Sequence, residues 1–280
     1  MKVVVLIENT KNGSKDLICE EGLSIYIETK DRRILFDTGR TGNFIVNAKR
    51  MGIELQQVDA VILSHGHHDH GGGLSSFFQI NDKAKIYAKR GVERDFYFRT
   101  ILFSNSIGIN KTVFNEYSDR INYVDGFTEI MDNVYIISEI EKQYKTPEGN
   151  KYLFVKYGNE VTRDKFDHEL IMVIREKDEL TIFTGCSHNG TANIIETVRS
   201  RFPGGKIKAI VGGFHLVRIP LIKILGPSQE EINILIKKIR DENIERVYTG
   251  HCTGEKAFKK LKDILGSNIS YISTGTELNI

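Results

Sequence analysis

Four histidines and one aspartate fall within six consecutive positions, in the segment His65-Gly66-His67-His68-Asp69-His70. An apolar run, Ala60 to Leu63, precedes this segment, and three glycines follow it. Neutral imidazole nitrogens and carboxylate oxygens bind zinc, and they also bind iron or manganese. Glycines let the backbone turn tightly enough to aim such ligands. The segment therefore predicts a metal site on a loop after a strand, and not a histidine tract that binds metal adventitiously.

The spacing within the segment predicts two half-sites. In an extended loop, alternate residues point to the same side, so His65 and His67 are expected to bind one metal ion. Asp69 and His70 are expected to turn toward a second point nearby. His68 lies between the ligands, and we expect it to face away and to support the site or meet solvent.

Other residues that can bind metal ions or protons also lie at the ends of predicted strands. Asp37, Cys186, His188, His215 and His251 each lie at or just past the end of an apolar run. Open α/β sheets bind their ligands at this edge of the sheet. We expect His251, in the segment TGHCTG, to complete the second metal site. Its neighbour Cys252 should point the opposite way, as a buried and inert thiol.

The elements that must position these residues form a weak internal repeat. Two β-rich runs around a turn, at residues 22–39 and 169–188, each predict a hairpin. Each second strand ends in Thr-Gly, and a polar loop and a helical pattern follow it. Ser228 and Glu231 predict a capping box, and Gly266 is expected to end the last helix. The pattern predicts one α/β domain over residues 1–280, an αββα sandwich of mixed sheets, with a less regular insert at about 75–150.

Taken in order, these motifs resemble the metallo-β-lactamase superfamily. The segment from His65 to His70 matches that family's metal signature, Asp37 in LFDTG its early aspartate, and His251 in TGH its late histidine. The resemblance implies a four-layer αββα sandwich with two mixed β-sheets and one or two metal ions, zinc in the usual case, at its rim. The segments EEGLSIYIE, SHGHHDHGGG, TGCSHNG and GGFHL further resemble the branch of the superfamily that contains a dihydropterin-type synthase.

The sequence departs from the family pattern at one ligand. Most relatives carry a bridging aspartate after Thr-Gly, where this chain has Cys186, and a thiolate favours zinc or leaves the second metal weakly held. The family also implies a third histidine for the first metal, either His188 or His168. We favour His188 because it belongs to the GCSH pattern of the branch, which leaves His168 beside the site. His215 matches no standard ligand, and we expect it to bind substrate or to transfer a proton.

The resemblance implies hydrolysis of a small metabolite by metal-bound hydroxide. Asp69 would orient the hydroxide or take its proton, and His215 would stabilise charge or protonate the leaving group. Asp37 would anchor the loop or orient the ligating histidines. Lys142 and Lys145 could receive a phosphate or carboxylate. The alternatives are a dihydropterin-type synthase, a di-iron redox enzyme on the same fold, and a metal-dependent ligand sensor without catalysis.

Composition limits the other classes of function. The 280 residues carry 39 basic and 37 acidic side chains, a net charge of +2, with both signs mixed along the chain. No basic track for nucleic acid is visible, and no apolar run approaches the roughly 18 residues of a membrane span. Three cysteines form no disulfide pattern, which favours a reducing cytoplasm. The expected partner is a small-molecule substrate, and a homodimer is left open.

Overall fold

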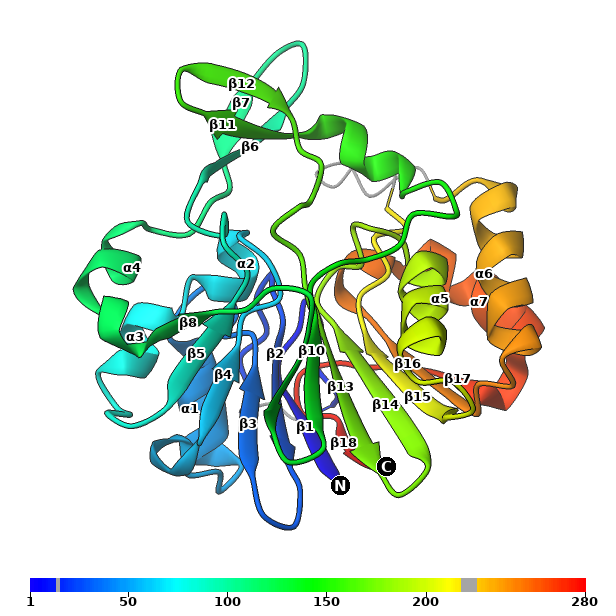
Figure 1. The fold of residues 1–280 in the computed structure, drawn as a ribbon, viewed down its shortest axis with the longest axis horizontal. Coiled ribbons are helices and arrows are strands. Elements are labelled where there is room, and N and C mark those ends of the chain that lie inside the picture. Colours follow the sequence, from blue (N-terminus) through cyan, green and yellow to red (C-terminus); the bar gives the residue numbers. More distant parts are fainter. Residues whose placement is uncertain (14–15, 218–225) are drawn as a thin grey trace. The chain divides into compact units, whose positions relative to one another are not determined.

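The chain folds into two compact units of mixed α/β structure (Figure 1). The computed structural model describes residues 1–13, 16–217 and 226–280. The first unit comprises Met1–Val124, Phe154–Thr162 and Ile272–Ile280, and the second comprises Asp125–Leu153 and Arg163–Tyr271. Each unit contains one seven-stranded sheet. The predicted α/β class and the two sheets are confirmed, whereas the single domain over 1–280 stays a prediction.

The sheet of the first unit is mixed. Its order is β18 (Glu277–Asn279), β1 (Lys2–Ile7), β2 (Ser24–Glu28), β3 (Arg33–Phe36), β4 (Ala60–Ile62), β5 (Lys85–Ala88) and β8 (Ile121–Tyr123). The first four strands in this order pair antiparallel, and those from β3 to β8 pair parallel. The helices of this unit are α1 (Asn43–Arg50), α2 (His68–Gly71), α3 (Leu74–Phe78) and α4 (Thr112–Glu116).

The sheet of the second unit repeats this plan. Its order is β9 (Phe127–Met131), β10 (Val134–Ile137), β13 (Ile171–Glu176), β14 (Glu179–Thr184), β15 (Lys206–Gly212), β16 (Arg246–Thr249) and β17 (Ile269–Tyr271). The strands from β9 to β14 are again antiparallel, and those from β14 to β17 are parallel. The helices are α5 (Thr191–Arg201), α6 (Gln229–Asp241) and α7 (Glu255–Leu265).

The two sheets thus confirm the internal repeat. In each unit an antiparallel hairpin, β2–β3 or β13–β14, leads through a Thr-Gly loop into a helix, α1 or α5. Parallel strands are then added beyond the hairpin. Because all these parallel strands run in one direction within a unit, their carboxyl ends meet at one edge of its sheet, which is where the sequence places the candidate ligands.

Each unit buries its own hydrophobic core. In the first unit Phe44 of α1 and Leu74 and Phe77 of α3 pack against strand residues such as Leu35 and Val61. In the second unit apolar side chains of α5, α6 and α7 form a cluster with apolar side chains of β13, β14, β15 and β16. Helix faces with this apolar spacing are stabilised by burial against the sheet. Among the described residues, no helix is both long and apolar enough to cross a bilayer.

The predicted helix ends have the expected chemistry. The Ser228 hydroxyl accepts a hydrogen bond from the backbone N–H of Glu231 at 3.2 Å, and the Glu231 carboxylate accepts one from the N–H of Ser228 at 2.9 Å. This reciprocal pair is the predicted capping box at the start of α6. The last helix, α7, ends at Gly266, whose φ of 58° favours glycine.

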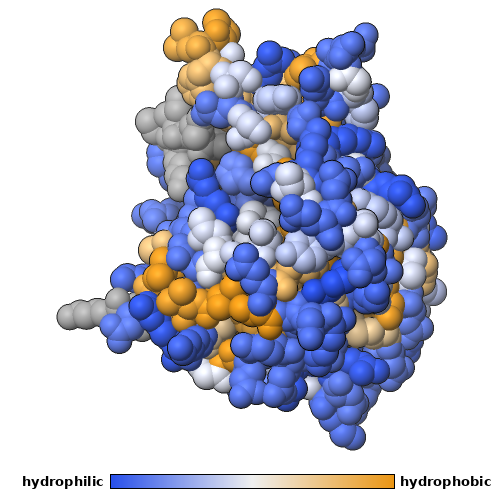
Figure 2. Space-filling model, turned by 90° about the vertical axis from the view of Figure 1, so that its left-hand side faces the viewer, coloured by the Kyte–Doolittle hydropathy of each residue, from blue (hydrophilic) through white to orange (hydrophobic). Residues whose placement is uncertain are grey.

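The segment 75–150 contributes strands to both large sheets and to a third, smaller one. β5 and β8 extend the first sheet, and β9 and β10 begin the second. The third sheet has the order β12 (Glu160–Arg163), β11 (Leu153–Tyr157), β6 (Asp95–Arg99) and β7 (Ser104–Ser106). The turn between β6 and β7 exposes Ile101 and Leu102 almost completely. Figure 2 shows hydrophobic side chains protruding at the top of its view.

We expect Asn47 to be a key polar residue of the first unit. Its side-chain amide is fully buried, donates to the carbonyl oxygens of Leu6 and Ile18 at 2.7 Å, and accepts from the N–H of Ile18 at 2.9 Å. Asn47→Ala leaves these backbone groups without partners, so it should lower the free energy of unfolding by about 3 kcal/mol in urea denaturation. Lys49→Ala, on the exposed face of the same helix, should change it by less than about 0.5 kcal/mol.

Candidate metal centre

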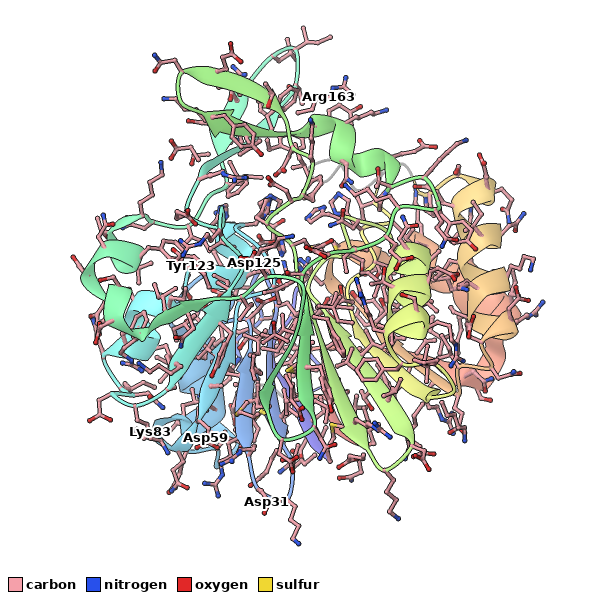
Figure 3. The ribbon with its side chains drawn as sticks, viewed as in Figure 1. Asp31, Asp59, Lys83, Tyr123, Asp125 and Arg163 are labelled. Atoms are coloured by element: carbon pink, nitrogen blue, oxygen red, sulfur yellow. The ribbon has the colours of Figure 1, made fainter. Side chains whose placement is uncertain are left out.

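The histidine loop lies at the carboxyl end of β4. That strand ends at Ile62, and α2 begins at His68, so the loop is short and held at both ends. Figure 3 labels Asp59 and Lys83 at the opposite end of this sheet, where they form an ion pair with a separation of 3.6 Å. The loop is therefore at the predicted edge of the first sheet.

His65 and His67 are arranged to share one ligand. Both side chains are almost completely buried, and the Nε2 atom of His65 lies 3.1 Å from the Nδ1 atom of His67. Two nitrogens bound to one zinc ion at about 2.0 to 2.1 Å are roughly 3.4 Å apart in a tetrahedral site. The hydroxyl of Ser64 lies 2.8 Å from the other ring nitrogen of His65, which fixes the orientation of the imidazole. The pair fits a divalent metal ion.

Asp69 and His70 provide a second pair of donors. The Nε2 atom of His70 lies 3.7 Å from a carboxylate oxygen of Asp69. The opposite nitrogen, Nδ1, lies 2.6 Å from the carboxylate of Asp37, which is fully buried. A carboxylate on Nδ1 fixes the tautomer in which that nitrogen carries the proton, and leaves Nε2 with its lone pair toward Asp69.

Asp37 also ties two strand ends together. One of its carboxylate oxygens accepts from the backbone N–H of Ser64 at 2.8 Å, and the other accepts from the Ser64 hydroxyl at 2.7 Å. Its own N–H donates to the carbonyl of Ile62 at 2.9 Å. The backbone of Asp37 has a φ of 59°, in the left-handed region that costs about 1–3 kcal/mol for such a residue. The strained residue is held because the ends of β3 and β4 both bind it.

The glycines after the histidines allow a close approach of two loops. A Cβ atom on Gly72 would lie 2.2 Å from the carbonyl oxygen of Arg40, and one on Gly73 would lie 2.4 Å from that of Thr38. The N–H of Thr38 in turn donates to the carbonyl of His70 at 2.7 Å. Side chains here would push the loop after β3 away from the histidine loop. His68 begins α2, is half-buried, and has its N–H bound to the carbonyl of Ile107.

In the second unit, His188 is held by residues that the sequence did not indicate. Its Nδ1 atom lies 3.0 Å from the side-chain oxygen of Asn150, and the amide of Asn150 donates to the His188 carbonyl at 2.8 Å. The ring of Phe166 stacks on the imidazole with a centroid distance of 4.1 Å and an interplanar angle of 10°. Nδ1 is thereby set as the proton-bearing nitrogen, and Nε2 is the one that suits a metal ion.

Glu169 fixes the backbone of the same loop. Its buried carboxylate accepts from the N–H of His188 at 2.7 Å and from the N–H and side-chain amide of Asn189, both at 2.8 Å. Burial raises the pKa of Glu169, and these three donors oppose the rise. Sequence reasoning missed both Glu169 and Asn150, because neither lies at a strand end or in a ligand motif.

His168 and the two candidate lysines have partners within the second unit. The Nε2 atom of His168 lies 3.0 Å from the carboxylate of Asp164, and both side chains are buried. Lys142 donates to the carbonyl of Lys165 at 3.1 Å, and Lys145 forms an exposed ion pair with Glu230 at 3.2 Å. The supporting role of His168 and the substrate role of Lys142 and Lys145 stay predictions.

Cys186, His215 and Cys252 form a cluster at the carboxyl ends of β14, β15 and β16. One donor atom from each residue lies within 4.8 Å of the other two. Burial raises the pKa of the Cys252 thiol, but its contacts with Cys186, His251 and His215 outweigh this effect and hold the pKa well below its usual value. The Cys252 side chain is therefore not directed away from the site, as the sequence had suggested, because its thiol lies against Cys186.

The backbone is strained at both late histidines. His215 has a φ of 45° and His251 a φ of 51°, and both side chains are buried. Strain of this kind persists only where surrounding contacts hold the residue in place, and it is frequent at functional sites. The predicted ligand role of His251 and the predicted substrate role of His215 stay predictions.

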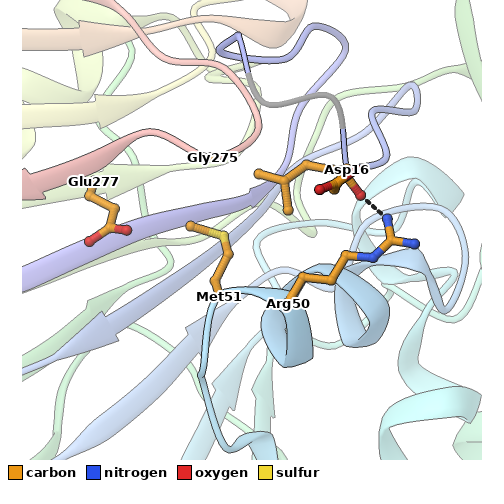
Figure 4. A pocket seen from close by; sticks show the side chains of 6 residues that line it. Asp16, Arg50, Met51, Gly275 and Glu277 are labelled. Atoms are coloured by element: carbon orange, nitrogen blue, oxygen red, sulfur yellow. Dashed lines mark hydrogen bonds between the residues drawn. The ribbon is translucent and has the colours of Figure 1, made fainter.

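A separate hollow in the first unit lacks the histidines and cysteines of the clusters described above. It has a volume of about 560 Å³ and is lined by Asp16, Leu17, Arg50, Met51, Gly275 and Glu277 (Figure 4). The guanidinium of Arg50 donates to the backbone carbonyl of Asp16 across it. None of these lining residues is a histidine or a cysteine, so the hollow is not a candidate for the metal centre.

Comparisons with known proteins agree with this description. The family model of the metallo-beta-lactamase superfamily matches residues 18–201. A protein from Methanocaldococcus jannaschii, 7,8-dihydropterin-6-methyl-4-(beta-D-ribofuranosyl)-aminobenzene-5'-phosphate synthase, is 28% identical over 273 residues, which cover 92% of this chain and 89% of that protein.

Two solved structures are also similar. Tm1679, described as a metal-dependent hydrolase of the beta-lactamase superfamily, superposes with a TM-score of 0.84 and 29% identity over 100% of this chain and 99% of that chain. Zn²⁺-bound PqqB from Methylobacterium extorquens superposes with a TM-score of 0.59 and 13% identity, with 100% coverage of both chains. The second likeness concerns the fold alone.

We predict that Asp37→Asn weakens metal binding about 10- to 100-fold, because an amide cannot accept from Ser64 and His70 together as the carboxylate does. Competition with a chelator measures the affinity. Asp31→Asn, in the exposed turn of the β2–β3 hairpin labelled in Figure 3, is the control and should leave the affinity unchanged. Equal affinity in Asp37→Asn and the wild type would contradict this role.

Glu169 offers a second test. Glu169→Gln replaces one acceptor oxygen by an NH₂ group that faces N–H donors, so the loop that carries His188 should loosen. We expect faster amide hydrogen exchange at residues 188 and 189 and a lower free energy of unfolding, by about 1–3 kcal/mol. Glu139→Gln, at an exposed position of the same unit, is the control. Unchanged exchange at both amides would show that Glu169 does not hold the loop.

Proposed function

Because the chain belongs to the metallo-β-lactamase superfamily, we propose that it is a metal-dependent hydrolase of a small phosphorylated or carboxylated metabolite. The observation that carries the proposal is the 3.1 Å separation of the ring nitrogens of His65 and His67, which matches two ligands of one metal ion. An imidazole pair in this geometry, with the carboxylate and imidazole of Asp69 and His70 two residues further along, has the donor chemistry of a metal site.

The proposed ligands are those expected from the sequence. His65 and His67 bind the first metal ion, Asp69 and His70 bind the second, and His188, His251 and Cys186 supply further ligands. A thiolate is a soft donor, so Cys186 favours zinc over iron or manganese. The orientations of His70 and His188 support this set, since each has its Nδ1 atom held by an oxygen, which places the proton on Nδ1 and the lone pair on Nε2.

A bound divalent ion would lower the pKa of a water molecule to about 7 and would polarise the substrate oxygen under attack. The carboxylate of Asp69 is the residue we assign to orient that water and accept its proton, because its side chain is about one-fifth exposed beside buried imidazoles. The Asp37 carboxylate accepts from Nδ1 of His70 and so orients its imidazole. His215 remains the proposed residue for binding substrate or protonating the leaving group.

The proposed substrate class rests on basic and hydrogen-bonding groups of the second unit. Lys145 lines a cavity of about 110 Å³ together with the first turn of α5, which begins three residues after His188. The amino end of a helix and the charge of Lys145 favour an anionic group, whereas Glu148, Glu230 and Glu231, which also line this cavity, oppose one. The product named for the M. jannaschii relative contains a phosphate, which supports the same class.

A synthase is the second candidate, and the 28% identity to the M. jannaschii synthase over most of this chain favours it. The 29% identity to Tm1679 favours hydrolysis. The two candidates differ in the bonds that change: a hydrolase incorporates water into its product, whereas a synthase would join the 6-methylene carbon of a dihydropterin to an aminobenzene, displacing a leaving group such as diphosphate from that carbon. A panel of phosphomonoesters, phosphodiesters and thioesters, run beside a dihydropterin-6-methyl diphosphate with a ribosylaminobenzene phosphate, separates them, because only the synthase reaction needs both compounds and releases diphosphate.

We predict that His65→Ala with His67→Ala removes the first metal ion and lowers turnover at least about 1,000-fold, a loss of roughly 4 kcal/mol of transition-state stabilisation. Metal content by mass spectrometry and turnover on the active panel member measure this. His68→Ala should retain the metal of the wild type, because that residue faces away in the proposed ligand set. Full turnover by the metal-depleted double variant would refute the proposed mechanism.

A further inference from the structure

The proposed function does not explain why two cysteines and one histidine, Cys186, Cys252 and His215, lie together in one cluster. Its three donor atoms lie within 4.8 Å of one another and come from the ends of three adjacent strands of one sheet. Cys186 is 3% exposed and His215 is 5% exposed. The proposed function gives a metal role to Cys186 alone, treats His215 as a substrate residue and leaves Cys252 without a role.

The imidazole of His215 is the unusual member. Neither of its ring nitrogens has a hydrogen-bond partner among the residues that the structure describes, although both are buried. A buried polar group without a partner costs about 1–3 kcal/mol, so native proteins rarely retain one without a ligand or a water molecule. The ring lies beside two thiols, which are donors for soft metal ions.

The backbone around the cluster is built to hold it in place. The N–H of Gly213 donates to the carbonyl of Gly185 at 2.8 Å, and the N–H of Phe214 donates to the hydroxyl of Thr253 at 3.0 Å. The N–H of His215 donates to the Sγ atom of Cys252 at 3.3 Å. Backbone donors to a cysteine sulfur stabilise its thiolate form, which is the form that binds metal.

Two glycines leave the room that the cluster needs. A Cβ atom on Gly213 would lie 2.6 Å from the Sγ atom of Cys252, and one on Gly149 would lie 2.9 Å from the Nε2 atom of His215. Any larger residue at either position would push a donor atom out of place. The cluster is therefore enclosed by a backbone that approaches closely on two sides.

We propose that Cys186, His215 and Cys252 are three ligands of one thiolate-bound divalent metal ion, with zinc as the ion of choice. In a tetrahedral zinc site with Zn–S of about 2.3 Å and Zn–N of about 2.0 to 2.1 Å, donor atoms are roughly 3.4–3.8 Å apart. The donor atoms of the cluster lie within 4.8 Å of one another, so a shift of about 1 Å separates them from that geometry. On binding, each thiol bonds to the metal as a thiolate and releases its proton to solvent.

This inference shares Cys186 with the proposed function and otherwise goes beyond it. It makes His215 a ligand and not a proton donor, and it makes Cys252 a ligand and not an inert thiol. Two thiolates select zinc, or cadmium and cobalt as substitutes, against magnesium and manganese. Three protein ligands leave a fourth position for a water molecule or a substrate atom.

Cobalt binding to the full-length protein tests the inference, because a thiolate ligand gives Co²⁺ an intense near-ultraviolet charge-transfer absorption that imidazole and carboxylate do not give. All variants carry Cys19→Ser, which removes the exposed cysteine and leaves Cys186 and Cys252 as the only thiols. We expect the Cys19→Ser protein to show the absorption and to protect two thiols from alkylation when Co²⁺ is bound.

Three further variants separate this site from the histidine loop. His65→Ala with His67→Ala should keep the thiolate absorption, whereas Cys252→Ser and His215→Ala should each weaken Co²⁺ binding at the thiolate site at least about tenfold. Circular dichroism of the metal-free proteins establishes that each variant is folded, and Cys252→Ala replaces Cys252→Ser if the latter is not.

Two results would overturn the inference: no thiolate absorption in the Cys19→Ser protein, or the same absorption and affinity in the Cys252 and His215 variants. The proposed function fails separately, if no panel substrate is turned over by the metal-loaded wild type. Thiolate absorption that persists in the His65 and His67 double variant supports the inference whatever the turnover.

Discussion

The buried carboxylate of Asp37 is the contact on which the histidine loop depends. It accepts hydrogen bonds from the backbone N–H and the hydroxyl of Ser64 and contacts the Nδ1 atom of His70. The backbone N–H of Asp37 donates to the carbonyl of Ile62. A charge with no solvent and no partners would be very costly here, so the carboxylate is stable only while the ends of β3 and β4 present these donors. The same four contacts set the tautomer of His70 and the start of the loop. The conformation of the loop and the orientation of the His70 imidazole therefore depend on the same contacts.

In the second unit, different residues hold the loop and orient its histidine. Its β14–α5 loop corresponds to the β3–α1 loop of the first unit, yet the buried carboxylate comes from Glu169, before β13, and not from the strand end. Asn150 takes the place that Asp37 has toward His70 and holds the Nδ1 atom of His188. An amide oxygen accepts from the Nδ1 atom of an imidazole as a carboxylate oxygen does, but the amide carries no negative charge. The two halves of the repeat thus retain the topology while the polar groups that orient the histidines have changed.

Much of the fold could be predicted from the sequence, because the signals were local. The two hairpins, the capping box of Ser228 and Glu231, and the repeat of strand, Thr-Gly loop and helix depend on residues close together in the chain, and all are confirmed. Membership of the metallo-β-lactamase superfamily and its α/β fold are confirmed as well. The strand pairings within residues 75–150 could not be predicted, since short strands such as β5 and β8 gain their stability from neighbours that are distant in the sequence. Asn150 and Glu169 could not be predicted for a similar reason. Each holds the His188 loop through hydrogen bonds between residues distant in the sequence, and no sequence spacing indicates such contacts.

Cys252 shows where reasoning from alternation fails. Adjacent residues point to opposite sides only while the backbone is extended. Here the chain turns into a short 3₁₀ helix at His251–Thr253, and His251 has a φ of 51°, so the alternation does not hold. The thiol of Cys252 is therefore turned toward Cys186 and the N–H of His215. The backbone strain at His251 and His215 brings a second sulfur to a cluster that the sequence suggested would have one. A site with two thiolates and one imidazole differs in metal preference from the carboxylate-bridged pattern of most relatives, because softness of the donor set, and not its position in the fold, decides which ion it retains.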